Sequence, residues 1–125
     1  VKLPYLEAKT ERRREIADKY AQGIILQNAV LPHEPNWGRS VFHMYTLQHP
    51  DRDRLKTYLA EKGIGTDIVY PYPLHLQPCF ADRGYGVGSF PESEKLAKHC
   101  LSLPIVPELT DAEVDYVIES INAFS

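Results

Sequence analysis

Apolar residues recur at a spacing of three or four residues in three parts of this chain, which is the pattern of helices with one buried face. The first predicted helix spans residues 6–22. The second lies between Asp51, its predicted N-cap, and Gly63, which suits a left-handed C-terminal cap. The third begins after Thr110, which is predicted to form a capping box with Glu113. Each of these helices needs an apolar surface to pack on.

Short stretches of alternating apolar and polar residues predict strands between the helices. The clearest covers residues 40–48, and shorter strands are expected at 24–27, 66–70 and 101–105. Both faces of the 40–48 stretch carry apolar residues, which favours a central position in a sheet. Few short strands alternating with helices predict an α+β fold, in which a small, mostly antiparallel sheet has helices packed on one face. The other face of the sheet is expected to need a cover from outside this chain.

Composition narrows the possible functions. The 125 residues carry a formal net charge of −3 with acidic and basic residues interleaved, so no basic stripe for nucleic acid is present. The one long uncharged run, residues 68–81, contains three prolines, and prolines in such a run argue against a membrane helix. Cys79 and Cys100 have no metal-binding spacing, and we interpret them as reduced thiols of a cytoplasmic protein. His75 beside Cys79 offers too few ligands for a metal site.

The stretch VYPYPLHLQPCF, residues 69–80, is the most unusual part of the chain. Its prolines cannot continue a central strand or a helix interior, yet its aromatic and aliphatic side chains are costly to expose. A glycine-rich turn at 84–88 follows. Ser89 and Glu92 then predict a capping box for a fourth helix that ends at Cys100. The sequence thus predicts a stiff, irregular, aromatic segment next to a helix.

Two histidines are candidates for a functional role. The prolines around His75 fix its direction, and a pocket role and a packing role remain equally open for it. His43 lies between apolar residues, where a core histidine bonded to a neighbour is the simpler interpretation. The chain has no nucleophile elbow and no phosphate-binding loop of known pattern.

Residues 63–80, GIGTDIVYPYPLHLQPCF, include this irregular segment. Their sequence resembles part of the C-terminal domain of the DegT/DnrJ/StrS aminotransferases. These are pyridoxal-phosphate enzymes of the aspartate-aminotransferase fold (type I) that mostly aminate keto-sugars on nucleotide carriers. Further resemblance is found in RRREIADKY, VFHMYTLQHPDRDRLKTYLAEKGI and SFPESEKLAKHCLSLPIVPELTDAEVDYVIESI. The order is unchanged over nearly the whole chain. Thr10 and Val69 depart from the family pattern, where asparagine and histidine are common.

The resemblance implies that residues 1–125 form a single C-terminal small domain, with 6–22 as the helix that joins it to a preceding large domain. That large domain would carry the Schiff-base lysine and hold pyridoxal phosphate, so this chain is expected to supply no catalytic, cofactor-binding or metal-binding residue and to be inactive alone. The intact enzyme is expected to be a cytoplasmic homodimer that uses an amino donor, usually glutamate, and a nucleotide-linked keto-sugar from polysaccharide, lipopolysaccharide or secondary-metabolite biosynthesis.

Within this small domain, the residues expected to form a wall of the substrate cleft are Tyr70, Pro71, His75 and Gln77, with His43 as a further candidate. Two alternatives remain at this point. One is a sugar dehydratase of the same family, in which the lysine is replaced. The other is a non-catalytic sugar-binding or assembly module.

Overall fold

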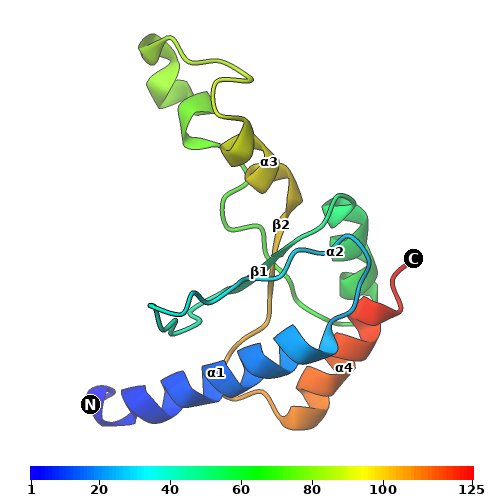
Figure 1. The fold of residues 1–125 in the computed structure, drawn as a ribbon. Coiled ribbons are helices and arrows are strands. Elements are labelled where there is room, and N and C mark those ends of the chain that lie inside the picture. The colour runs from blue at the N-terminus through cyan, green and yellow to red at the C-terminus, as the bar shows by residue number, and fades with distance from the viewer.

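The computed structural model describes residues 1–125 and contains four α-helices and two strands (Figure 1). In chain order these elements are α1 (Leu6–Gly23), β1 (Tyr45–Gln48), α2 (Arg52–Glu61), α3 (Pro91–His99), β2 (Cys100–Leu103) and α4 (Asp111–Asn122). Short 3-10 turns occur at Leu3–Tyr5 (η1), Leu74–Leu76 (η2) and Pro78–Arg83 (η3). The helix predicted at 6–22 is therefore present as α1.

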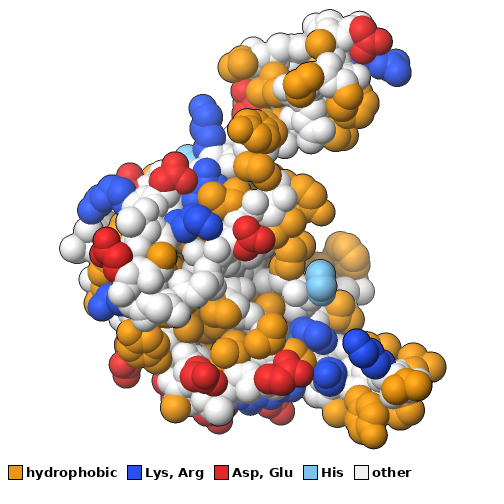
Figure 2. Space-filling model, turned by 180° about the vertical axis from the view of Figure 1, so that it is seen from behind, with side chains coloured by type: hydrophobic (Ala, Val, Ile, Leu, Met, Phe, Trp, Pro, Cys, Tyr) orange, Lys and Arg blue, Asp and Glu red, His pale blue; other side chains and the backbone are white.

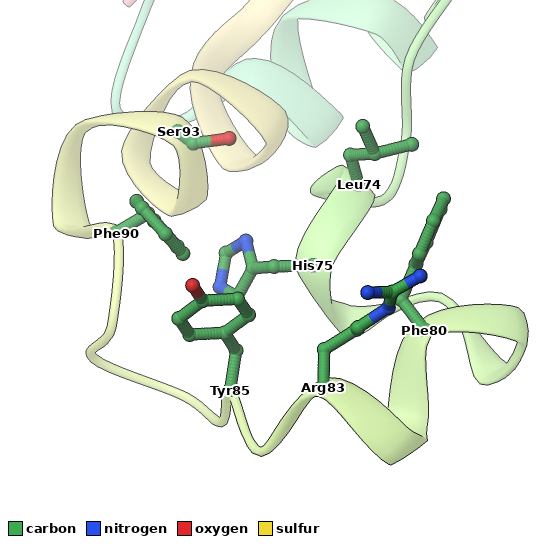
Figure 3. A pocket seen from close by; sticks show the side chains of 7 residues that line it. All are labelled: Leu74, His75, Phe80, Arg83, Tyr85, Phe90 and Ser93. Atoms are coloured by element: carbon green, nitrogen blue, oxygen red, sulfur yellow. The ribbon is translucent and has the colours of Figure 1, made fainter.

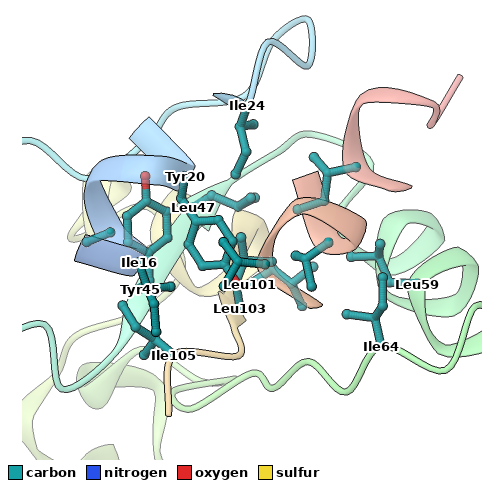
Figure 4. Close-up of a cluster of buried hydrophobic side chains, with 14 of the residues drawn as sticks. Ile16, Tyr20, Ile24, Tyr45, Leu47, Leu59, Ile64, Leu101, Leu103 and Ile105 are labelled. Carbon is teal, nitrogen blue, oxygen red and sulfur yellow. The ribbon is translucent and has the colours of Figure 1, made fainter. Parts of the chain in front are cut away.

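The two strands form an antiparallel pair at the centre of the molecule. Tyr45 lies opposite Leu103 and Leu47 lies opposite Leu101, so four apolar side chains point to the same face. All four are buried. Helices α1, α2 and α4 gather around this face (Figures 1 and 4). The predicted α+β class, with helices on one face of a small antiparallel sheet, is confirmed.

The sheet is smaller than the sequence predicts. The strand expected at 40–48 begins only at Tyr45, because Phe42 has a φ of 44° and interrupts the extended run. No strand forms at 24–27 or 66–70. Two isolated backbone bridges flank the sheet, and they join Val30 to Gln48 and Asp67 to Ser102.

One cluster of buried apolar side chains holds the sheet and the three helices together (Figure 4). The predicted apolar stripes supply about half of it: Ile16 and Tyr20 from α1, Leu55 and Leu59 from α2, and Val114, Val117 and Ile121 from α4. Each fully buried side chain of this size stabilises the fold by roughly 1.5–3 kcal/mol relative to exposure. The helical periodicity therefore encodes the helical part of the core, and the strands and loops supply the rest.

Two predicted helix caps are confirmed. Gly63 has a φ of 75°, and the Ile64 amide donates to the Leu59 carbonyl at 2.9 Å, as in a Schellman cap. At the start of α4, the Thr110 amide donates to Glu113 at 2.8 Å while the Glu113 amide donates to the Thr110 hydroxyl at 3.3 Å. Thr110 and Glu113 thus form the capping box.

The second face of the sheet is polar rather than apolar. Thr46 and Ser102 point to this face and their hydroxyls are hydrogen-bonded at 2.8 Å. Seven of the 19 large exposed apolar side chains lie on residues 70–99, which we call the arm. The arm projects from the layer of helices and strands (Figure 1) and forms a separate lobe with many apolar side chains on its surface (Figure 2). Exposed apolar side chains therefore lie on the arm and also beside this face of the sheet, where Met44, Val69 and Val106 line a hollow that includes Ser102.

Candidate functional site

The arm is built from short turns because its sequence excludes longer elements. Pro71, Pro73 and Pro78 each lack a backbone donor, and the chain between them forms η2 and η3 instead of a strand. Gly84 has a φ of 75° and Gly88 a φ of 90°, so glycine is required for the turn that leads into α3. The irregular segment predicted at 69–80 is confirmed.

The start of α3 differs from the prediction. The capping box expected between Ser89 and Glu92 is wrong, because Phe90 is the N-cap residue and no side chain caps the helix there. Ser89 instead accepts a hydrogen bond from the Gly86 amide at 3.1 Å and so closes the glycine turn. Pro91 at the first helical position supplies the helix start that the missing cap does not.

Glu94 organises the arm. Its carboxylate accepts the Gly88 amide at 2.8 and 3.0 Å, the Phe90 amide at 3.4 Å and Nε2 of His75 at 3.1 Å. Partial burial raises the pKa of Glu94, but the Gly88 amide, His75 and the Phe90 amide together lower it below its ordinary value. An ionised Glu94 therefore connects η2, the glycine turn and α3.

His75 is the buried centre of this arrangement. It is 9% exposed, and its ring packs edge-on against Phe90 with the ring centres 4.8 Å apart. Because a carboxylate only accepts, the Nε2 atom that contacts Glu94 carries the proton. Nδ1 makes no hydrogen bond within the chain. His75 thus combines the packing role and the pocket role that the sequence left open.

A cavity of about 320 Å³ lies beside His75 (Figure 3). Its lining residues are Leu74, His75, Phe80, Arg83, Tyr85, Phe90 and Ser93. The segment at 69–80 supplies Leu74, His75 and Phe80 to this lining, but Tyr85 was not anticipated, because residues 84–88 were interpreted only as a glycine-rich turn. The sequence feature that could have indicated this cavity is the pair of aromatic residues, Tyr85 and Phe90, which flank Gly86 and Gly88.

The other predicted site residues lie apart from this cavity. Tyr70 is 75% exposed and Pro71 is exposed, near the base of the arm. Gln77 is half-buried and accepts a weak hydrogen bond from the Cys79 thiol at 3.9 Å. None of these three residues lines the arm cavity.

His43 lies in a different place from His75. It is exposed, so its interpretation as a core histidine is wrong. The bend at Phe42 turns this segment away from the core. His43 lines a second hollow of about 490 Å³ on the polar side of the sheet, together with Arg13, Asp67 and Ser102. The structure therefore separates His43 from His75.

A buried arginine fixes the base of the arm. Arg52, at the start of α2, is 8% exposed and donates to the carbonyls of Cys100 at 2.9 Å and Ala97 at 3.3 Å. These carbonyls lie where α3 ends and β2 begins. Sequence reasoning missed Arg52 because a charged residue beside an N-cap is normally exposed.

The lysines do not fit a covalent cofactor site. None of the chain's lysines is buried, and none lines the arm cavity or the second hollow. Lys19 is held by Asp111 and Asp115, and Lys56 by the Thr66 carbonyl. The chain therefore contains no desolvated amine suited to a Schiff base with pyridoxal phosphate.

No group of three or more histidine, cysteine, aspartate or glutamate side chains is arranged to hold a metal ion. None of the helices has both the length and the apolar character that a membrane crossing needs.

Comparison with known proteins gives matches over nearly the whole chain. Residues 1–122 match the model of the DegT/DnrJ/EryC1/StrS aminotransferase family. The chain is 46% identical to the "Pleiotropic regulatory protein" of Geobacillus stearothermophilus, with 99% of this chain and 34% of that protein covered. It is 36% identical to the dTDP-3-amino-3,6-dideoxy-alpha-D-galactopyranose transaminase of Aneurinibacillus thermoaerophilus, again with 99% and 34% covered.

Among solved structures, DesV of S. venezuelae, crystallised in complex with a ketimine intermediate, superposes with a TM-score of 0.92 at 34% identity. The match covers 96% of this chain and 33% of DesV. The chain thus spans about a third of the length of the curated relatives and of the structure it matches.

Proposed function

Because this chain belongs to the DegT/DnrJ/EryC1/StrS aminotransferase family, we propose that it forms the small domain of an enzyme that transfers an amino group to a nucleotide-linked keto-sugar. The observation that carries this proposal is the unbroken match over residues 1–122, together with the transaminase activity named for the Aneurinibacillus relative. In this proposal a separate large domain holds pyridoxal phosphate, the family's cofactor, in line with a chain that spans about a third of the relatives it matches. The amino donor in this proposal is glutamate, and the intact enzyme is a dimer.

The share of the work assigned to this chain is to form one wall of the substrate cleft. Tyr70 and Pro71 are exposed at the base of the arm, and prolines limit the backbone freedom of this segment in advance. Gln77 offers an amide on the same segment. His75 lines the arm cavity, and His43 lies at the separate hollow near the sheet.

The test uses the longer protein that contains this chain, supplied with pyridoxal phosphate, glutamate and a nucleotide-linked keto-sugar. Amine transfer to the sugar is the expected result, and a protein that transfers no amine from any donor contradicts the proposal. Replacing His75 by alanine should lower kcat/KM for the sugar by about a few-fold to a hundred-fold, the range of one lost hydrogen bond. The reaction of the enzyme with glutamate alone should be unchanged, because it needs no sugar.

His99→Ala is the matched control, because His99 lies at the end of α3 and its side chain makes no hydrogen bond. Equal losses in the sugar and glutamate reactions after His75→Ala would assign this histidine a structural role.

A second candidate function is non-catalytic. The relative at 46% identity is named a regulatory protein, and another, at 39% identity from Saccharopolyspora erythraea, is named a sensory transduction protein. A sugar dehydratase of the same family is the further alternative. The residue at the Schiff-base position of the longer protein separates them, since an aminotransferase requires lysine there.

A further inference from the structure

We propose that the second hollow, on the polar side of the sheet, binds the amino acid that donates the amino group, with Arg13 pairing with a carboxylate of this donor. This inference rests on the proposed function and extends it, since it gives the amino donor a contact of its own within this chain. The hollow has a volume of about 490 Å³, which lies within the range of small-molecule sites, roughly 300–1,000 Å³.

Arg13 is the arginine of this chain that has no partner. Each of the other six arginines takes part in a hydrogen bond or an ion pair, and Arg13 takes part in neither. Its neighbours on α1, Arg12 and Arg14, are held by acidic side chains. Arg13 itself is half-buried and lines the hollow. A guanidinium in this position suits a carboxylate, because its fork of N–H groups fits both carboxylate oxygens.

The acidic side chains around α1 already pair with other residues. Glu11 pairs with two arginines, and Glu15 pairs with Arg12. Glu108 pairs with Lys9 at 3.3 Å. None of these carboxylates bonds to Arg13, so its charge is available to a ligand in the hollow.

Asp67 makes the hollow suit an amino acid better than a simple anion. It is the only acidic residue of the lining, and one of its carboxylate oxygens accepts the Ile68 amide at 2.8 Å. Arg13 and Asp67 together give the hollow one charge of each sign. A ligand that carries a carboxylate and an amino group matches this pair, whereas Asp67 repels inorganic phosphate.

The rest of the lining suits the carbon chain of an amino acid. Met44, Val69 and Val106 are exposed apolar residues of the hollow. The hydroxyl of Ser102, which also lines it, is already bonded to Thr46 at 2.8 Å. The hollow therefore combines two charged groups with apolar surface, as glutamate itself does.

The experiment uses the longer protein that contains this chain, supplied with pyridoxal phosphate. The probe is 2-methylglutamate, which has no α-hydrogen and so cannot complete the transfer, and its binding is measured by calorimetry. Arg13→Gln should raise both the Kd for 2-methylglutamate and the KM for glutamate by about ten-fold to a hundred-fold, the range for one lost hydrogen bond with a charged group. Arg13→Lys should recover part of this loss, because it keeps the charge but not the planar fork.

A second measurement separates the donor from the sugar. The same variants are supplied with pyridoxamine phosphate, so that amine transfer to the keto-sugar needs no donor. We expect Arg13→Gln to leave this reaction unchanged. His75→Ala should have the opposite pattern, since it is expected to slow the sugar reaction and not the glutamate reaction.

Arg54→Gln is the matched control, because the Arg54 side chain is 66% exposed and lies outside the second hollow. This change should alter neither the Kd for 2-methylglutamate nor the sugar reaction. Circular dichroism of each variant checks that the fold is retained.

Three outcomes overturn the inference: an unchanged Kd for 2-methylglutamate in Arg13→Gln, an equal rise of this Kd in Arg54→Gln, or equal losses in the glutamate and sugar reactions of Arg13→Gln. The last outcome would assign Arg13 to a contact with the rest of the longer protein. Failure of the proposed function has a different signature. A longer protein that binds 2-methylglutamate through Arg13 but transfers no amine to a keto-sugar contradicts only the proposed function.

Discussion

Replacing Arg52 by methionine should lower the free energy of unfolding by about 1.5–3 kcal/mol, the range for hydrogen bonds with one charged partner. The guanidinium donates to the Cys100 and Ala97 carbonyls at 2.9 and 3.3 Å. Methionine keeps an apolar chain of similar length, so the loss reports on the charged head and not on packing. The methionine variant no longer carries the free-energy cost of desolvating a buried cation. This gain offsets part of the loss of the hydrogen bonds, so the expected net loss stays within this range.

The assay is urea unfolding followed by circular dichroism, in which a change of this size lowers the midpoint by about 1 M. Hydrogen exchange of the last turn of α3 gives a second measurement, because the Ala97 carbonyl belongs to that turn and loses its cap. Hydrogen exchange in the last turn of α3 should accelerate more than exchange in α4, to which Arg52 donates no hydrogen bond.

Arg54→Met is the matched control on the same helix. Its side chain is 66% exposed and bonds to the Ser125 carbonyl at 3.0 Å, so its loss should cost less than about 1 kcal/mol. The loss of unfolding free energy in Arg52→Lys should lie between the losses in these two variants, because a single ammonium group replaces the planar guanidinium. Equal stability of the Arg52→Met and Arg54→Met variants would refute the view that Arg52 secures the base of the arm.

Two further predictions concern caps. Gly63→Ala should destabilise the chain by about 1–2 kcal/mol, because Gly63 has a φ of 75° that an L residue adopts only with strain. Gly65→Ala is the control in the same urea assay. It should be close to neutral, because Gly65 has no positive φ and a Cβ added there would lie within 4 Å of no other atom. Hydrogen bonds from the Thr110 amide and hydroxyl lower the pKa of Glu113 in the folded chain below its ordinary 4.5. The ionised Glu113 therefore stabilises the fold fully above pH 4.5, and this stabilisation is lost as the pH falls through the lower pKa of the folded chain. Glu113→Gln should therefore flatten the dependence of unfolding free energy on pH below about pH 5, and an unchanged slope would show that the capping box does not depend on the carboxylate charge.

The parts of the fold that could be predicted are those set by local chemistry. The stripe of α4 and its Thr110 cap follow from spacing alone, and so does the stop of α2 at Gly63. The strands at 24–27 and 66–70 were wrong because β propensity reflects packing on neighbours, which these segments lack apart from single bridges nearby. Strand pairing across the chain cannot be read from a window of eight residues.

The candidate site was predicted in part for the same reason. The prolines and His75 marked the right segment, because backbone restriction is written in the sequence. Glu94 and Tyr85 could not be found this way, since their contacts with His75 and Phe90 depend on how the glycine turn folds back. Whether Tyr70, Pro71 and Gln77 contact substrate stays a prediction.

The bridge between Asp67 and Ser102 has a consequence for how such a domain can diversify. The Asp67 amide donates to the Ser102 carbonyl at 3.1 Å, and the Ser102 amide donates to the Asp67 carbonyl at 2.8 Å. The backbone before the arm is thus hydrogen-bonded to the backbone after it. Insertions or deletions within the arm, residues 70–99, need not shift the register of β1 and β2, because Cys100 and Leu101 keep their partners on β1. The entropic penalty for lengthening a closed loop is small, about 0.6 kcal/mol for each doubling. Natural variation or grafting can therefore exchange the arm as one unit, because none of the residues of the buried core cluster lies within residues 70–99.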